Sequence, residues 1–360
     1  EKCRRCYECV RECPARAVKI SGGQAVVLND RCIACGHCVR VCSQGAKAVI
    51  DASVDVTALI KDYPDDVIAI LAPSFPSFFP ECDPANKLVG AIKELGFSEV
   101  IEVAFGADLV AKKYKELYEK STKSYITTPC PSIVYYIRQY MPDLVDNLAP
   151  IVSPMIAIAR AIKWKYKPNA KVVFIGPCVA KKYEAIDPQV AGVVDEVLTF
   201  QELRLMFKEK NINPVESEPL EFDGPKASLG RLFPISTGLI KSAGIGFDLA
   251  ENDVIFAEGK ERVLSILQSF QDKEIEPRFF DLLFCEGCVN GPFSPSYEKK
   301  YSNRDGVLKY YRNQLGKFNE KEWLRWMEEF ADIDLYQHFV VDKRLLPIPT
   351  KPQIEQQLKQ

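Results

Sequence analysis

Long apolar runs are missing from this sequence, and histidine is scarce. The longest apolar stretch, Val67 to Ala72, is the length of a strand, whereas a membrane-spanning helix needs about 18 apolar residues. The 360 residues include two histidines and show no Ser-His-Asp context, phosphate-binding glycine loop or zinc-binding helix motif. The sequence therefore gives no support for a hydrolase, kinase or protease, and we expect no membrane partner.

An excess of charge of either sign is also missing. The 47 basic and 49 acidic residues leave a net charge of −2, so no global field favours nucleic acid or an anionic membrane surface. We predict neither as a partner. The apolar fraction of 47% and the charged fraction of 27% are typical of a soluble globular protein. The length suits one small module followed by one large core.

Cysteine is the residue in excess, with 13 in the chain. Two runs share the spacing C-x2-C-x2-C-x3-C, which is typical of bacterial ferredoxins, where the fourth cysteine of each run ligates the other cluster. A zinc ribbon or a set of disulfides fits these spacings poorly. We therefore predict two [4Fe-4S] clusters with crossed ligands: Cys3, Cys6, Cys9 and Cys42 for cluster 1, and Cys32, Cys35, Cys38 and Cys13 for cluster 2.

The segment between the two cysteine runs has the pattern of a hairpin. Val18 to Ile20 and Ala25 to Leu28 flank a glycine turn, Ser21-Gly22-Gly23-Gln24. We place a ferredoxin-like module at residues 1–55. Thiolate ligands indicate a reducing compartment, so we expect a cytoplasmic protein. His37, between two predicted ligands, is expected to be an exposed surface residue.

From about Val67 onward, short apolar runs alternate with amphipathic stretches. This order predicts an α/β fold with parallel sheets covered by helices. One helix is expected to open at Asp83 and Pro84 and to close at Gly96, and Thr199 to Glu202 forms a capping box that starts another. The predicted strands are Val67 to Ala72, Glu99 to Ala104, Ser124 to Thr127, Lys171 to Ile175, Val193 to Leu198 and Asp281 to Phe284.

Four further cysteines follow three of these strands. Cys130, Cys178, Cys285 and Cys288 each stand just beyond a predicted strand end, where cofactors gather in parallel sheets. Scattered buried cysteines would not be placed so regularly. The pattern predicts a site with four thiolate ligands.

The residues around these cysteines resemble the three active-site motifs of FeFe hydrogenases, in order and spacing. Shorter segments resemble the same family, and the likeness extends from Cys3 to about Arg312. It implies a large, two-lobed α/β H-cluster domain with parallel sheets, which we place at residues 56–346. The three motifs are Thr127-Thr128-Pro129-Cys130-Pro131, Gly176-Pro177-Cys178-Val179-Ala180-Lys181-Lys182-Tyr183-Glu184 and Cys285-Glu286-Gly287-Cys288-Val289-Asn290-Gly291; the shorter segments are Ala72-Pro73-Ser74, Phe105-Gly106-Ala107-Asp108 and Ser153-Pro154.

The resemblance also implies cofactors and roles. The four cysteines would hold the third [4Fe-4S] cluster of the chain, and Cys288 would bridge it to a di-iron unit with carbon monoxide, cyanide and a bridging dithiolate. Lys181 would donate to a cyanide, and Glu184 would orient Lys181. The residues implied to line the cofactor pocket are Ala72, Pro73, Ser74, Pro129, Pro177, Phe233 and Gly238.

Several positions depart from the highly active members of that family. Those members carry a cysteine where Pro129 stands, and two glutamates and a serine where Tyr114, Leu117 and Ala149 stand, so the usual proton carriers are missing. The departures resemble a divergent branch of hydrogen sensors. The sequence therefore favours slow, reversible conversion of protons and electrons to H2, with a redox partner such as ferredoxin and a signalling domain or partner.

Two other functions stay open: an efficient hydrogenase with a different proton path, and an iron-sulfur protein for electron transfer or cluster assembly. Lys181 argues against the last of these. Residues 347–360 have the composition of a linker or of the start of a further segment.

Overall fold

The computed structural model describes residues 2–246, 253–294, 299–345 and 350–358. Nine strands and fifteen α-helices are assigned in these residues, together with four short 3-10 helices and one π-helix. The strands are β1 (Val18–Ser21), β2 (Gln24–Val27), β3 (Val67–Leu71), β4 (Glu99–Glu102), β5 (Tyr125–Ile126), β6 (Lys171–Gly176), β7 (Glu196–Thr199), β8 (Val254–Glu258) and β9 (Phe279–Leu283). The α-helices are α1 (Glu8–Arg11), α2 (His37–Arg40), α3 (Ser53–Asp62), α4 (Phe75–Phe78), α5 (Lys87–Glu94), α6 (Val103–Lys120), α7 (Pro131–Tyr140), α8 (Pro154–Ala161), α9 (Ala180–Ala185), α10 (Phe200–Glu209), α11 (Gly238–Ala243), α12 (Lys260–Gln271), α13 (Lys300–Leu315), α14 (Glu320–Glu329) and α15 (Lys351–Leu358). The 3-10 helices are η1 (Asn29–Arg31), η2 (Pro142–Asn147), η4 (Leu229–Leu232) and η5 (Cys288–Asn290), and the π-helix is η3 (Ile162–Tyr166).

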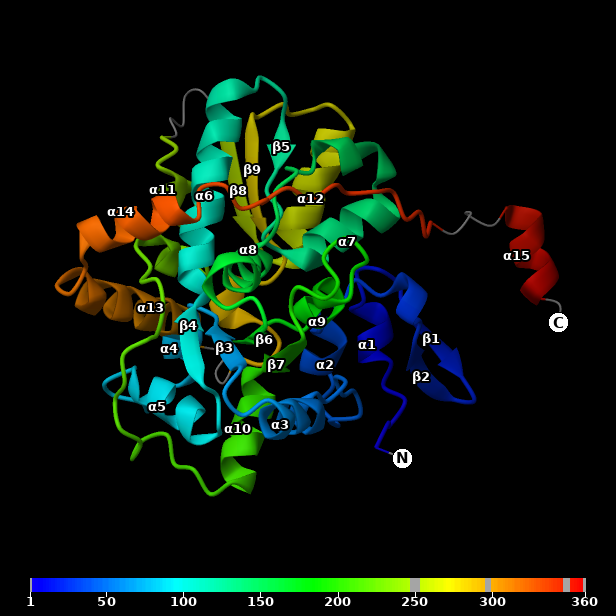
Figure 1. Cartoon of the computed structure of the whole chain (residues 1–360). Helices are drawn as coiled ribbons and strands as arrows, with labels where there is room; N and C mark the ends of the chain where they lie inside the picture. The colour runs from blue at the N-terminus through cyan, green and yellow to red at the C-terminus, as the bar shows by residue number, and fades with distance from the viewer. Residues whose placement is uncertain (1, 247–252, 295–298, 346–349, 359–360) are drawn as a thin grey trace.

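Two separate parallel sheets form the large part of the molecule. One has the strand order β4-β3-β6-β7 and the other has the order β5-β9-β8. Each sheet has its own buried apolar cluster, and α6 packs against α8 between them (Figure 1). The α/β class, the parallel sheets and the two lobes are therefore confirmed.

The N-terminal module packs on the lobe of the second sheet. Ala15, Ala17 and Ile33 belong to the same buried cluster as β9. Gly36 lies so close to this lobe that a Cβ there would be 2.6 Å from Cγ of Pro292. The predicted hairpin is confirmed as the antiparallel pair β1–β2. In Figure 1 the module lies beside the lobe, while α15 lies apart from the rest of the chain.

Some predicted element bounds were wrong. The strand expected to run to Ala104 ends at Glu102, because α6 begins at Val103 and packs tightly on α8; a Cβ on Gly106 would be 2.3 Å from the Pro154 carbonyl oxygen. The helix expected to open at Asp83 begins at Lys87. Strand β8 was not predicted, because its burial is mixed and gives no clear alternation.

Other local predictions held. The capping box on Thr199 is present, with the Glu202 side chain accepting from the Thr199 backbone N–H at 2.6 Å. None of the described helices combines the length and apolar character needed to cross a bilayer. Within residues 347–360, predicted to be a linker or the start of a further segment, positions 347–349 and 359–360 lie outside the described residues, and α15 occupies Lys351–Leu358.

Candidate metal centre

Both sheets contribute cysteines to one site. Cys130 follows β5 and caps α7, while Cys285 and Cys288 follow β9 of the same sheet. Cys178 follows β6 of the other sheet, immediately before α9. Because the carboxyl ends of the strands from both lobes face the same gap, the site lies between the two lobes.

The four thiols lie close enough to perturb one another. Burial raises the pKa of Cys178 to about 11, with a further contribution from Cys130. Burial likewise raises the pKa of Cys285 well above its usual value, and the thiols of Cys130, Cys178 and Cys288 add to this rise. Four mutually repelling buried thiols are costly as bare thiolates, and iron offsets that cost by binding them.

An apolar cavity opens beside these thiols. Cys178, Cys288 and Lys181 line it, and the aromatic and proline side chains around it keep its wall dry. Six of the seven residues expected to line a cofactor pocket are in its wall: Ala72, Pro73, Ser74, Pro129, Pro177 and Phe233. Gly238 does not line it. A Cβ on Gly238 would be 1.8 Å from the Leu232 carbonyl oxygen, so this glycine allows α11 to approach η4 instead.

The polar atoms in the cavity suit a polar, electron-rich ligand. The Lys181 Nζ donates to Glu184 Oε2 at 2.6 Å and to the Pro129 carbonyl at 3.4 Å, which leaves one of its three donors for the cavity. The Ser74 hydroxyl lines the same cavity and is buried without a hydrogen-bond partner among the described residues. Donors of this kind fit cyanide and carbon monoxide ligands, so the residues present suit the H-cluster.

The ferredoxin-like module shows the crossed arrangement of its thiols. One small cavity is lined by Cys3, Cys6, Cys9 and Cys42, which come from both runs. In the second set, burial raises the pKa of Cys35 to about 12, and the thiols of Cys32, Cys13 and Cys38 contribute to this rise.

Among the residues that the structure describes, no group of three or more His, Cys, Asp or Glu side chains is placed to chelate one ion. A four-iron cluster needs a wider arrangement, since each of its thiolates binds a different iron. Thiols spread around a cavity meet that need.

The second set of module thiols adjoins the four-thiol site. Cys35 and Cys285 line the same small cavity, and the Cys35 thiol contributes to the raised pKa of Cys285. Cys6, in the first set of module thiols, is exposed. The thiols therefore run in three groups from the surface to the cavity between the lobes.

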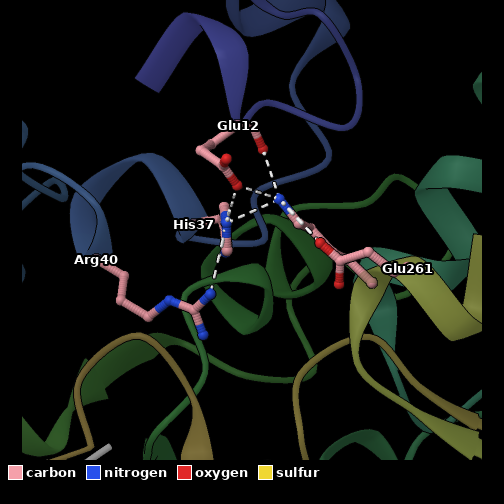
Figure 2. Close-up of polar contacts among 5 residues, drawn as sticks. Glu12, His37, Arg40 and Glu261 are labelled. Atoms are coloured by element: carbon pink, nitrogen blue, oxygen red, sulfur yellow. Dashed lines mark hydrogen bonds and ion pairs between the residues drawn. The ribbon is translucent and has the colours of Figure 1, made fainter. Parts of the chain in front are cut away.

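A partly buried polar cluster joins the module to the start of α12, beside this site (Figure 2). The Lys260 Nζ, at the start of α12, donates to Glu12 Oε2 at 2.5 Å and lies 3.1 Å from His37 Nε2. The prediction that His37 is exposed was wrong: its exposed fraction is 9%. Burial, together with the charges of Arg40 and Lys260, lowers the pKa of His37, so the neutral ring accepts the hydrogen bond.

One polar residue of the cavity was not predicted. Asp281 lies in its wall, on β9, with an exposed fraction of 5%. The sequence treated this residue as part of an apolar strand. A lone acidic residue inside an otherwise apolar run was the signal that could have identified it, because a buried carboxyl needs a reason to be there.

Two positions of the missing proton carriers, Tyr114 and Pro129, hold no side chain that is free to carry a proton. The Tyr114 hydroxyl accepts from the Thr128 backbone N–H at 2.9 Å and shares a hydrogen bond with the Thr128 hydroxyl at 2.9 Å. Burial raises the pKa of Tyr114 far above its usual value. Pro129 lines the cavity with a side chain that neither donates nor accepts.

Comparison with known proteins agrees with this arrangement. Residues 65–292 match the family model for the iron-only hydrogenase large subunit, C-terminal domain, and residues 2–47 match the 4Fe-4S dicluster domain. Iron hydrogenase 1 of Clostridium pasteurianum is 26% identical over 333 residues, which cover 76% of this chain and 58% of that protein. The cytosolic Fe-S cluster assembly factor NAR1 of Vanderwaltozyma polyspora is 30% identical over 108 residues, which cover 30% of this chain and 20% of that protein.

A solved structure supports the fold. The apo [FeFe]-hydrogenase HydA1 of Chlamydomonas reinhardtii, variant C377H, aligns with a TM-score of 0.65 at 18% identity and covers 82% of this chain and all of that one. The chain spans less than two thirds of the length of both curated relatives. Because the family model matches well over half of the chain, this protein belongs to the iron-only (FeFe) hydrogenase family and carries an N-terminal 4Fe-4S dicluster domain.

Proposed function

We propose that this chain binds an H-cluster and interconverts H2 with protons and electrons slowly, as a hydrogen or redox sensor. The observation that carries the proposal is the cavity itself. It lies beside four convergent thiols, two of which line it, and its wall holds a buried lysine and has Pro129 where the family resemblance implies a proton carrier. We infer that the site would bind the cofactor and would transfer protons to it slowly.

The proposed ligands of the [4Fe-4S] part are Cys130, Cys178, Cys285 and Cys288, and Cys288 would bridge to the di-iron unit. When bound, that unit supplies the redox chemistry of H2. Cys178 and Cys288 line the cavity, so the side of the [4Fe-4S] cluster that is joined to the di-iron unit would face this cavity. The apolar wall keeps water out, so charges inside the cavity interact strongly.

Lys181 and Glu184 would hold the di-iron unit in place. Both side chains are about 10% exposed, and their 2.6 Å ion pair fixes the ammonium at the edge of the cavity. A charge-assisted hydrogen bond from this ammonium would orient a cyanide ligand, and the Ser74 hydroxyl would add a neutral one.

Electrons would enter through the module. Cys6 is exposed, so cluster 1 would be the cluster nearest the surface, where a redox partner such as ferredoxin would dock. Cluster 2, held by Cys35 and its partners, would pass electrons on to the cubane at Cys285, because both thiols line one small cavity. Lys260 would keep these two groups at a constant separation through its bonds to Glu12 and His37.

Slow turnover is expected because proton transfer is hindered. A proton relay needs titratable groups at hydrogen-bond spacing, and Pro129 and the engaged Tyr114 hydroxyl do not provide them. A slow site whose redox state follows H2 suits sensing. A signalling domain or partner would then read out that state, in a cytoplasmic setting that keeps the thiolates reduced.

The test is infrared spectroscopy of protein matured with the di-iron cofactor, followed by an H2-evolution assay on the same sample. Carbonyl and cyanide bands that shift under H2, together with slow turnover, are the expected result. Fast turnover would replace the sensor with an efficient hydrogenase that uses another proton path. A full set of cubane clusters without these bands would overturn the hydrogenase proposal.

The last outcome would favour a second function, in electron transfer or cluster assembly. The local likeness to the assembly factor NAR1 is the observation behind it. Lys181 opposes it, because a protein that binds only cubane clusters has no need of an ammonium in an empty apolar cavity.

A further inference from the structure

Asp281 is an acidic side chain placed inside the cofactor cavity. On β9, alternate residues face opposite sides: Phe280 and Leu282 belong to the buried core of the second sheet, whereas Asp281 and Leu283 line the cavity. Asp281 is 5% exposed and shares this cavity with Cys288. The carboxyl therefore faces the place where the di-iron unit would bind.

No basic side chain among the described residues forms an ion pair with this carboxyl. Lys181, the one lysine in the cavity wall, is already paired with Glu184 at 2.6 Å. The other titratable groups facing Asp281 are the hydroxyl of Tyr114 and the thiol of Cys288. Burial raises the pKa of Asp281 to about 7, and the Thr127 hydroxyl beside it moderates the rise.

A carboxyl in this state is suited to general acid–base work. At neutral pH it is present in both forms, and a catalytic group is most efficient when its pKa lies near the working pH. A buried carboxyl whose only purpose was structural would be expected to have an ion-pair partner or several donors. Asp281 has neither among the described residues, apart from the Thr127 hydroxyl.

We propose that Asp281 carries protons to and from the di-iron site, in place of the relay that Pro129 and Tyr114 interrupt. This inference rests on the proposed function. Each H2 needs two protons, so in H2 formation the carboxylic acid would deliver a proton twice: each time its O–H bond breaks, the proton becomes part of H2, and the carboxylate takes a new proton from the solvent. The two electrons come through the clusters, and in H2 oxidation every step runs in reverse.

The same geometry accounts for slow turnover. The Thr127 hydroxyl beside Asp281 makes no hydrogen bond among the described residues, and the Tyr114 hydroxyl is held by Thr128. Each new proton therefore has to arrive by way of water that enters an apolar cavity, and apolar cavities hold water poorly.

The test compares Asp281→Asn with the control variant Tyr114→Phe in full-length protein loaded with all clusters and the di-iron cofactor. The Asn variant keeps the size and polarity of the side chain and loses the proton. We expect its H2 turnover to fall about 100-fold, a typical contribution of one general acid or base. The Phe variant removes a nearby buried hydroxyl outside the cavity wall and should keep most of its turnover.

A second readout does not depend on activity. In the infrared difference spectrum between the H2-reduced and oxidised states, the wild type should show a carboxylic acid C=O band that the Asn variant lacks. If the Asn variant retains its carbonyl and cyanide bands and also the wild-type rate, the Asp281 inference is overturned while the proposed function stands. If the wild type itself shows no carbonyl or cyanide bands, the proposed function fails first.

If instead Tyr114→Phe loses turnover as strongly as Asp281→Asn, the proton path runs through the tyrosine and the assignment to Asp281 alone is wrong. Loss of the carboxyl band together with loss of rate, confined to the Asn variant, is the result that supports it.

Discussion

Replacing Lys181 by methionine separates its role in folding from its role in cofactor binding. Its ammonium is 2.6 Å from Glu184 Oε2, and the two side chains are 10% and 9% exposed. Lys181→Met leaves a buried carboxylate without its partner, which lowers the free energy of unfolding by about 3–5 kcal/mol. The variant Lys181→Met/Glu184→Met removes both charges, so we expect its stability to return to that of the wild type or above.

Cofactor binding should not return with stability. Both variants lack the charge-assisted hydrogen bond to the di-iron unit, which is worth about 1.5–3 kcal/mol. This corresponds to roughly 10- to 150-fold weaker binding. The measurement is an anaerobic titration of cubane-loaded protein with the di-iron cofactor. The amount bound is read from the intensity of the cyanide and carbonyl infrared bands. Anaerobic denaturation of the same samples gives the stability.

The adjacent Lys182 provides a matched control. Its Nζ is 2.8 Å from Glu202 Oε1 and its side chain is 12% exposed, but it does not line the cavity. Lys182→Met should therefore lose similar stability and bind the cofactor as the wild type does. Equal binding by the wild type and Lys181→Met, or an equal loss of binding in Lys182→Met, would refute the assigned role of Lys181.

Three further predictions concern the ligands of the clusters, the pH dependence of stability and the buried Glu102–Arg231 ion pair. Cys42→Ser and Cys9→Ser should abolish the same cluster signal in electron paramagnetic resonance and leave the other; loss of different signals would contradict the crossed ligands. The folded-state pKa of Asp281 is raised from 3.8 to about 7, so the folded state binds more protons than the unfolded one between these values. Asp281 should accordingly contribute a fall of about 4 kcal/mol in the free energy of unfolding as pH rises from about 4 to 7. Denaturation of Asp281→Asn should lack this contribution and keep only the smaller one from the buried carboxyl of Asp108, whose pKa is raised to about 6. The Glu102 carboxylate accepts two hydrogen bonds, of 2.7 and 2.6 Å, from the buried Arg231 guanidinium. Glu102→Gln should therefore lower the free energy of unfolding by about 3–5 kcal/mol, measured by denaturation. A loss below about 1 kcal/mol would show that this ion pair contributes little to stability.

Local patterns were predictable because they depend on neighbours in the chain. The glycine hairpin and the Thr199 capping box appeared where their residues indicated. Strand ends were less predictable, since tertiary packing decided them: β4 stops at Glu102 because α6 must approach α8 closely at Gly106.

The sequence by itself determined the chemistry of this protein. Cysteine spacing sets which thiols can share a cluster, and the apolar runs set which strands bring Cys130, Cys178 and Cys288 to strand ends. Only the tertiary structure decided how these groups meet. Burial of His37 against Lys260 and of Asp281 in the cavity wall depends on segments more than a hundred residues apart in the chain. The environment that shifts a pKa or closes a cavity is made by such long-range contacts, and no local pattern encodes them.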